Sequence, residues 1–470
     1  MVCCLHAVQL GEERTRIMKI WKAVLGAGVA VVGVAVASAV VFVPVDLLKV
    51  GTGYAAKIVC SNVFIAGRDA DDVLALDVQA PGHPLLRLVS VDVSVDDRRV
   101  TAAMPLSFAA STAVYRDGLG CANVEADGLE AAKAFSAPVA GAAVADPMRT
   151  WPEGALVGQV DSRLREILAD EALLGPGYRA VVIVKDGRIL GEAYGDRITP
   201  ETPLLGWSMA KTVNAALVGI LAGQGGVDLD DDQLFEGWRD RDHARIRLAD
   251  LLAMESGIDF NESYGDLADV TRMLYLERDM AGYVQTLGLA AAPEKRFNYS
   301  SGDSVLIARH WMSKLPTLEV AHEFPRRALF DPLGMDSAVL EADARGTFVG
   351  SSYLYATAHD WARFGLLLAN DGVWQGRQIV PLDFIARMKT PSSASNGAYS
   401  QAQTWLKGPG DEDGAGEGDT SATLWMLGHD GQSIAVDGGT GLVVVRLGLT
   451  PAKLGYRPQP LLKAIRDALD

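Results

Sequence analysis

Ser208 and Lys211 are spaced so that a lysine amine can lie beside a serine hydroxyl. The residues after Ser208 carry apolar side chains at three- and four-residue spacing up to Gly223, which predicts a helix. Residues three apart share one face of a helix. A serine hydroxyl is a weak nucleophile until a base takes its proton, and burial can lower a lysine pKa from ~10.4 enough to supply that base. The pair therefore indicates covalent catalysis, whereas a capping serine followed by a solvated lysine is the common alternative.

Two later motifs, Tyr299-Ser300-Ser301 and His429-Asp430-Gly431, support the catalytic interpretation. The Tyr299 phenol could transfer a proton if nearby positive charge eased its deprotonation, and Lys211 is the candidate charge. Alone, Tyr299 would be interpreted as a core tyrosine and His429 as a loop histidine. Three motifs in this order favour a function instead. Three acidic residues lie near these motifs in the sequence and receive no role: Glu262, Asp266 and Asp303.

The three motifs together resemble those of the β-lactamase-related serine hydrolases. These include class C β-lactamases, D,D-peptidases and related esterases, and the 6-aminohexanoate-dimer hydrolases are closest in character. The resemblance covers residues 151–470 and extends to the stretches Leu248–Gly257, Phe297–Gly302 and Tyr355–Gly365. It implies that Ser208 attacks a carbonyl to form an acyl-enzyme, that Lys211 accepts its proton, and that Tyr299 relays a proton to the leaving group.

The resemblance also implies where the substrate binds. The backbone N–H groups of Ser208 and Gln432 would form the oxyanion hole, and Ser301, His429 and Gly431 would contact the substrate. Ser301 and His429 stand where β-lactamases commonly have Asn and Lys, so a clamp on a substrate carboxylate is weakened. A small-molecule amide or ester is therefore expected rather than a lactam antibiotic.

The elements expected around these motifs predict an α+β fold of the β-lactamase/transpeptidase-like kind. Asp186-Gly187 is a hairpin signal between two β-rich runs, and a second pair of β-rich runs precedes a helix at the end of the chain. We expect both ends to complete one antiparallel sheet, with flanking helices and a helical subdomain between them. The polar stretch Gly408–Thr420 is expected to be a surface loop, and either a lid or a passive insertion. The expected strands and helix are Ala180–Val184, Ile189–Tyr194, Ser433–Val436, Leu442–Leu447 and Gln459–Leu469.

An apolar, uncharged run at residues 23–43 follows a flank rich in Lys and Arg. Its length suits a bilayer of ~30 Å, and the basic flank predicts a cytoplasmic N-terminus at residues 1–22. We expect an anchor in the inner membrane with the rest of the chain in the periplasm. A cleaved signal peptide ending near Ala37-Ser38-Ala39 is the alternative, and it leads to the same compartment.

Residues 44–150, termed the accessory segment, carry short β-rich runs and no catalytic signature. Residues 151–470 are termed the hydrolase region. If residues 1–17 are a start-site extension, Cys3 and Cys4 drop out of the count, and Cys60 and Cys121 remain. In an oxidising compartment these two could form a disulfide, and two buried free thiols are the alternative.

The composition and the charge limit which kinds of partner the protein can bind. The 470-residue chain has a formal net charge of −16 and no Lys/Arg-rich run, which argues against a nucleic-acid partner. No spacing indicates a metal site, and no cofactor is expected. Two other functions stay open: an α/β-hydrolase whose nucleophile elbow begins at Gly206-Trp207-Ser208, and a catalytically silent protein that binds cell-wall fragments.

Overall fold

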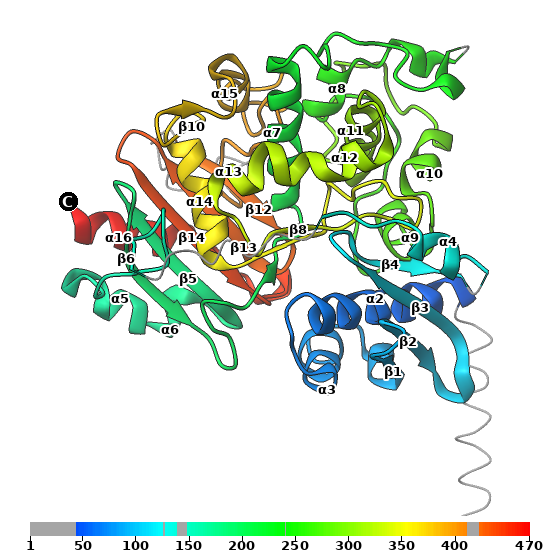
Figure 1. Ribbon diagram of the computed structural model, residues 1–470, viewed down its shortest axis with the longest axis horizontal. Helices are drawn as coiled ribbons and strands as arrows, with labels where there is room; N and C mark the ends of the chain where they lie inside the picture. The colour runs from blue at the N-terminus through cyan, green and yellow to red at the C-terminus, as the bar shows by residue number, and fades with distance from the viewer. Residues whose placement is uncertain (1–43, 126, 139–147, 240, 411–422) are drawn as a thin grey trace, which may run out of the picture.

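Two pieces of chain from opposite ends of the hydrolase region form one five-stranded antiparallel sheet, as predicted (Figure 1). The strand order is β12-β13-β14-β5-β6, and Val182 of β5 lies opposite Val445 of β14. An antiparallel sheet of this kind excludes the parallel α/β-hydrolase alternative. The strands are β12 (Leu424–Gly428), β13 (Gln432–Asp437), β14 (Leu442–Gly448), β5 (Tyr178–Lys185) and β6 (Arg188–Tyr194).

Helices cover both faces of this sheet because β5 is apolar on both sides. Successive side chains of a strand point to opposite faces. Val181 and Ile183 pack in a cluster with side chains of the C-terminal helix, whereas Val182 and Val184 belong to the main core, on the side of α14. The covering helices are α14 (Ala358–Ala369) on one face and α5 (Arg165–Ala169), α6 (Glu171–Leu174) and α16 (Gln459–Leu469) on the other.

A helical part fills the middle of the hydrolase region and holds the first two motifs. Its central helix, α11, packs against α7, α8 and α10. The helices of this part are α7 (Met209–Gly223), α8 (Leu248–Leu252), α9 (Asp269–Tyr275), α10 (Met280–Thr286), α11 (Ser301–Ser313) and α12 (Leu318–Pro325). The fold is α+β, as expected.

The structure is a computed structural model, and it describes residues 44–125, 127–138, 148–239, 241–410 and 423–470. Within these ranges, no helix combines the length and the apolarity needed to cross a membrane. The expected cytoplasmic segment (residues 1–22) and membrane anchor (residues 23–43) lie outside the described residues, as does most of the loop expected before the third motif.

The accessory segment is less purely β-rich than expected, because its first element is a 20-residue helix, α2 (Val45–Phe64). This helix packs on a four-stranded antiparallel sheet and contacts α9 of the hydrolase region. A disulfide joins Cys60 of α2 to Cys121 of β4, with the Cα atoms 6.1 Å apart. It is the pair that the sequence suggested. The strands are β1 (Ser90–Ser94), β2 (Arg99–Met104), β3 (Phe108–Arg116) and β4 (Gly120–Val124).

A buried ionic cluster fastens the accessory segment to the hydrolase region. Lys57 of α2 donates to Glu341 at 2.5 Å, and the Ser61 hydroxyl and the Cys121 N–H donate to the same carboxylate at 2.8 and 2.6 Å. Neither charged side chain is more than 3% exposed. Since an unpaired buried charge is costly, this carboxylate requires the accessory segment to be in place. The two parts therefore form one folded unit.

Candidate active site

The side chains of Ser208 and Lys211 meet at the N-terminus of α7. Lys211 Nζ lies 3.0 Å from Ser208 Oγ, 3.0 Å from Ser301 Oγ and 3.0 Å from the carbonyl oxygen of Ser351. A protonated lysine has three donors, and these contacts use all three. Lys211 is 1% exposed, whereas Ser208 is partly exposed. The Ser208 hydroxyl is therefore accessible from solvent, whereas its amine partner is not.

Ser208 is presented by a backbone that bends sharply just before it. Trp207 has a φ of 49°, a left-handed conformation that is rare for a bulky residue. A Cβ on Gly206 would lie 2.2 Å from the Trp361 ring, so only glycine fits there. The Trp207 ring is held in place by aromatic contacts with Tyr353 and His429. Such over-determined strain is typical of functional sites.

Burial gives Lys211 the character of a base. Loss of solvent disfavours the ammonium form and lowers the pKa of Lys211 to about 8, while the negative charge of Glu262 acts in the opposite direction. A value near neutrality leaves a usable fraction of neutral amine at physiological pH. The amine is therefore suited to accept the Ser208 proton.

Ser301 does not take the place expected for it. It was predicted to contact the substrate, but it is completely buried and links Lys211 to Glu262. Its hydroxyl donates to Glu262 at 2.6 Å and its backbone N–H donates to the other carboxylate oxygen at 2.7 Å. The reason is that its hydroxyl and its backbone N–H, at the first residue of α11, are both used by Lys211 and Glu262. Ser301 thus orients the lysine rather than a ligand.

Tyr299 lies on the other side of the lysine. Lys211 Nζ is 4.8 Å from the centroid of the Tyr299 ring, which packs on Trp405 and meets Tyr399 edge-on. Burial, with the charge of Glu262, raises the pKa of Tyr299, and interactions with Ser208 and Trp405 oppose the rise only in part. The phenol is therefore neutral at physiological pH, so it is a proton donor in the resting site. The easing of its deprotonation that the sequence suggested is not apparent.

The third motif forms the tight turn between the edge strand β12 and β13. The His429 ring stacks on Tyr264 with centroids 4.4 Å apart, and its Nε2 lies 3.5 Å from the Asp430 carboxylate. Gly431 has a φ of 80°, and its carbonyl accepts a bond from Arg446. His429 is thus the residue of this motif placed to meet a substrate, while Gly431 shapes the turn.

Gln432 begins β13 and is 3% exposed. Its side-chain amide is used inside the protein: Nε2 donates to the carbonyls of His429 and Gly448, and Oε1 accepts from the Gly448 N–H. These bonds fix the turn that carries His429. The oxyanion hole formed by the N–H groups of Ser208 and Gln432 stays a prediction.

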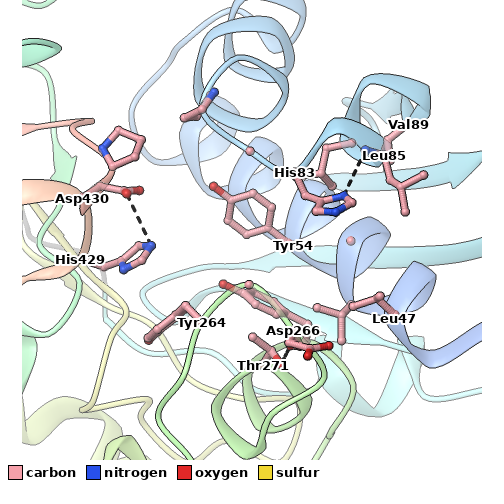
Figure 2. A pocket seen from close by; sticks show the side chains of 18 of the residues that line it. Leu47, Tyr54, His83, Leu85, Val89, Tyr264, Asp266, Thr271, His429 and Asp430 are labelled. Atoms are coloured by element: carbon pink, nitrogen blue, oxygen red, sulfur yellow. Dashed lines mark hydrogen bonds and ion pairs between the residues drawn. The ribbon is translucent and has the colours of Figure 1, made fainter. Parts of the chain in front are cut away.

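A mostly apolar pocket of about 430 Å³ lies between the hydrolase region and the accessory segment. Trp207, Tyr264 and His429 line it from the hydrolase region, and residues of α2 and of the segment after it form the facing wall. Figure 2 shows Tyr54 of α2 between His429 with Asp430 on one side and Leu85 with Val89 on the other. The accessory segment therefore forms one wall of the pocket beside the candidate active site.

Sequence reasoning missed Glu262 and this wall. Glu262 is near Tyr299 in sequence, but no motif distinguishes it from Asp266, which is exposed, or from Asp303, which is buried elsewhere against Ser256. The apolar periodicity of α2 was available as a signal for a helix. Nothing in that periodicity indicates which side of the helix meets Trp207. Within the described residues, no group of three or more potential metal ligands is found.

The fold and this serine–lysine–tyrosine arrangement define a serine hydrolase of α+β architecture. The family model described as "Beta-lactamase" matches residues 164–452, more than half of the chain. The protein belongs to the β-lactamase family. No curated protein sequence matches the chain.

Solved structures with the same fold are distant in sequence. A protein from Bacillus anthracis, provisionally described as a 6-aminohexanoate-dimer hydrolase, is 19% identical, with a TM-score of 0.53 over 69% of this chain and 88% of its own. EstCE1, described as a hydrolase with promiscuous acyltransferase activity, is 17% identical, with a TM-score of 0.51 over 65% and 97%. A penicillin-binding protein homologue from Caulobacter crescentus is 14% identical, with a TM-score of 0.51 over 66% and 99%. At these identities the likeness concerns the fold alone.

Proposed function

We propose that the protein cleaves an amide or ester bond of a small molecule through an acyl-enzyme on Ser208. The observation that most strongly supports this proposal is the 3.0 Å contact between Ser208 Oγ and the buried amine of Lys211, whose pKa is lowered to about 8. Neutral Lys211 takes the proton of Ser208 as its oxygen attacks the carbonyl. Tyr299, a neutral phenol, passes a proton to the leaving group and regains one from the Lys211 ammonium. Water then attacks the acyl-enzyme, gives a proton to neutral Lys211 and releases the acid, and the Ser208 oxygen takes back that proton from Lys211.

The proposed location is the periplasm, with the chain anchored in the inner membrane. Two observations support it: the apolar run at residues 23–43 with its basic flank, and the Cys60–Cys121 disulfide, which persists in oxidising compartments. A catalytically silent wall-fragment-binding protein is the less favoured reading, because a non-catalytic site has no need of a buried amine beside a partly exposed serine.

Covalent labelling tests the proposal. A fluorophosphonate should add once to the protein, and peptide mapping should place the adduct on Ser208. Incubation with a panel of esters, D-amino-acid amides, short amide oligomers and a chromogenic β-lactam, followed by intact-mass measurement, would identify the substrate class. Absence of any adduct on Ser208 would overturn the proposal and leave the silent binding protein.

A further inference from the structure

We propose that the pocket between α2 and the active site binds the apolar acyl chain of the substrate, so that the accessory segment selects the acyl group. This inference rests on the proposed function and names its substrate class: esters or amides of medium-length fatty acids. The pocket volume of about 430 Å³ lies in the range of roughly 300–1,000 Å³ typical of small-molecule sites.

The pocket adjoins Ser208 through Trp207, the residue before it in the chain, although Ser208 itself is not in the lining. The Trp207 ring lies in the wall together with Tyr264 and His429. Trp207 and His429 contact each other edge-on with centroids 5.5 Å apart, and Tyr264 stacks on the same histidine. These three rings form one connected wall of the pocket, and Trp207 joins this wall to Ser208 along the chain.

The far wall is apolar and comes from the accessory segment. Half-buried or buried aliphatic side chains from α2 and from the 3₁₀ helix η2 (Pro84–Leu88) face the hydrolase region. The polar lining residues His83, Asp266 and Lys453 are exposed, and the partly buried Asp430 carboxylate also lines the pocket, 3.5 Å from His429 Nε2. An uncharged chain therefore fits the walls better than a charged group, which would lose its hydration there. The aliphatic wall residues are Leu47, Leu48, Val50, Leu85, Leu86 and Val89.

The site's geometry assigns the pocket to the acyl part rather than to the leaving group. Tyr299, the proposed donor to the leaving group, packs among Tyr399 and Trp405. Among the described residues, the pocket lining includes none of Tyr299, Tyr399 and Trp405. The leaving group therefore departs on the Tyr299 side, and the acyl group, which stays bonded to Ser208, extends toward Trp207 and His429.

The wall is also rigid enough to select a ligand. The Cys60–Cys121 disulfide and the buried Lys57–Glu341 pair hold α2 against its own sheet and against the hydrolase region. A preformed wall lets a chain bind without a cost for ordering the protein. Chain-length preference is then a direct consequence of apolar burial.

The test measures kcat/KM of the full chain on p-nitrophenyl acetate, butyrate, hexanoate and octanoate. Each methylene that enters the pocket should raise kcat/KM by about fourfold until the pocket is full. Leu85→Trp narrows the pocket, so it should lower the ratio of kcat/KM for octanoate to kcat/KM for acetate by about tenfold or more. The matched control is Leu88→Trp, because Leu88 is 50% exposed on the same short helix and lies outside the lining.

A second pair of variants keeps the test decisive if Leu85→Trp does not fold. Leu47 of α2 lines the pocket, whereas Val45 on the same helix is 48% exposed and does not line it. Leu47→Trp should therefore lower the ratio of kcat/KM for octanoate to kcat/KM for acetate, and Val45→Trp should leave this ratio unchanged. If acetate is cleaved through Ser208 but chain length has no effect, the inference is wrong and the proposed function stands. If acetates of longer alcohols, rather than longer acyl groups, show the gain, the acyl assignment is wrong. If no ester or amide is cleaved at all, the proposed function itself fails.

Discussion

Lys211 and Glu262 occupy opposite sides of one hydroxyl group, that of Ser301. This hydroxyl accepts from Lys211 Nζ at 3.0 Å and donates to Glu262 at 2.6 Å. The carboxylate thereby fixes which way the hydroxyl points, because a hydroxyl that donates to Glu262 turns its lone pairs toward the amine. The Lys211 amine is therefore positioned by Ser301 and, through Ser301, by Glu262.

Substitution of the three proposed catalytic residues should separate their roles. Ser208→Ala and Lys211→Ala should each abolish turnover to a similar degree, since nucleophile and proton acceptor act as a unit and their losses are not additive. Tyr299→Phe should keep the fold, because the ring still packs on Trp405, but should lower kcat by ~10²–10⁴-fold. Steady-state kinetics on any cleaved ester checks this. A Lys211→Ala enzyme of near-normal rate would refute the serine–lysine assignment.

Removal of the Glu262 charge should shift the pH profile. In the wild type, kcat/KM should rise with pH as Lys211 loses its proton, with an apparent pKa of about 8. Glu262 raises that pKa, so Glu262→Gln should move the rise to lower pH and also lower kcat by loosening Ser301. Asp259→Asn, at an exposed carboxylate before Glu262 in the chain, should leave the profile unchanged. A profile that stays in place for Glu262→Gln would show that the carboxylate does not tune the amine.

The contact between Ser208 and Lys211 and the hairpin of β5 and β6 were predictable because local sequence determines them. A three-residue spacing on a helix brings Ser208 to Lys211, and Asp186-Gly187 with its flanking strands specifies a hairpin without reference to the rest of the chain. The disulfide partners followed once Cys60 and Cys121 were the only cysteines left in the expected mature chain. In each of these cases one short segment or one count carried the information.

The rest of the site depends on contacts between segments far apart in sequence. Ser301 was expected to meet the substrate, and only its packing beside Glu262 and Lys211 shows that it is buried. Glu341 pairs with Lys57, which is 284 residues away, and no local pattern relates the two. The pocket wall formed by α2 is of the same kind, because its function depends on which face of the helix meets Trp207.

Asp303 should make stability depend on pH. Burial raises the pKa of this carboxyl to about 8, whereas an unfolded aspartate has a pKa near ~3.9. Between these values the folded state holds a proton that the unfolded chain releases, so the free energy of unfolding falls as pH rises, by up to about 1.4 kcal/mol per unit. In Asp303→Asn this position has no carboxyl to deprotonate, so its free energy of unfolding does not fall in this way. From pH 5 to pH 8, the free energy of unfolding of the variant, measured with denaturant, should therefore rise relative to that of the wild type. Exposed Asp266→Asn should show no such trend, and a pH-independent difference for Asp303→Asn would contradict the argument.

Glu341→Gln should weaken the attachment of the accessory segment. The substitution leaves the Lys57 ammonium buried without its carboxylate, which typically costs about 3–5 kcal/mol. The matched control is Asp117→Asn, because Asp117 pairs with Arg98 in the same segment at 2.6 Å but both side chains are nearly half exposed, so its loss should cost less than about 1 kcal/mol. Denaturant midpoints measure the two costs, and limited proteolysis should cut Glu341→Gln first within the accessory segment. Equal midpoints for the two variants would mean that the buried pair does not hold the two parts together.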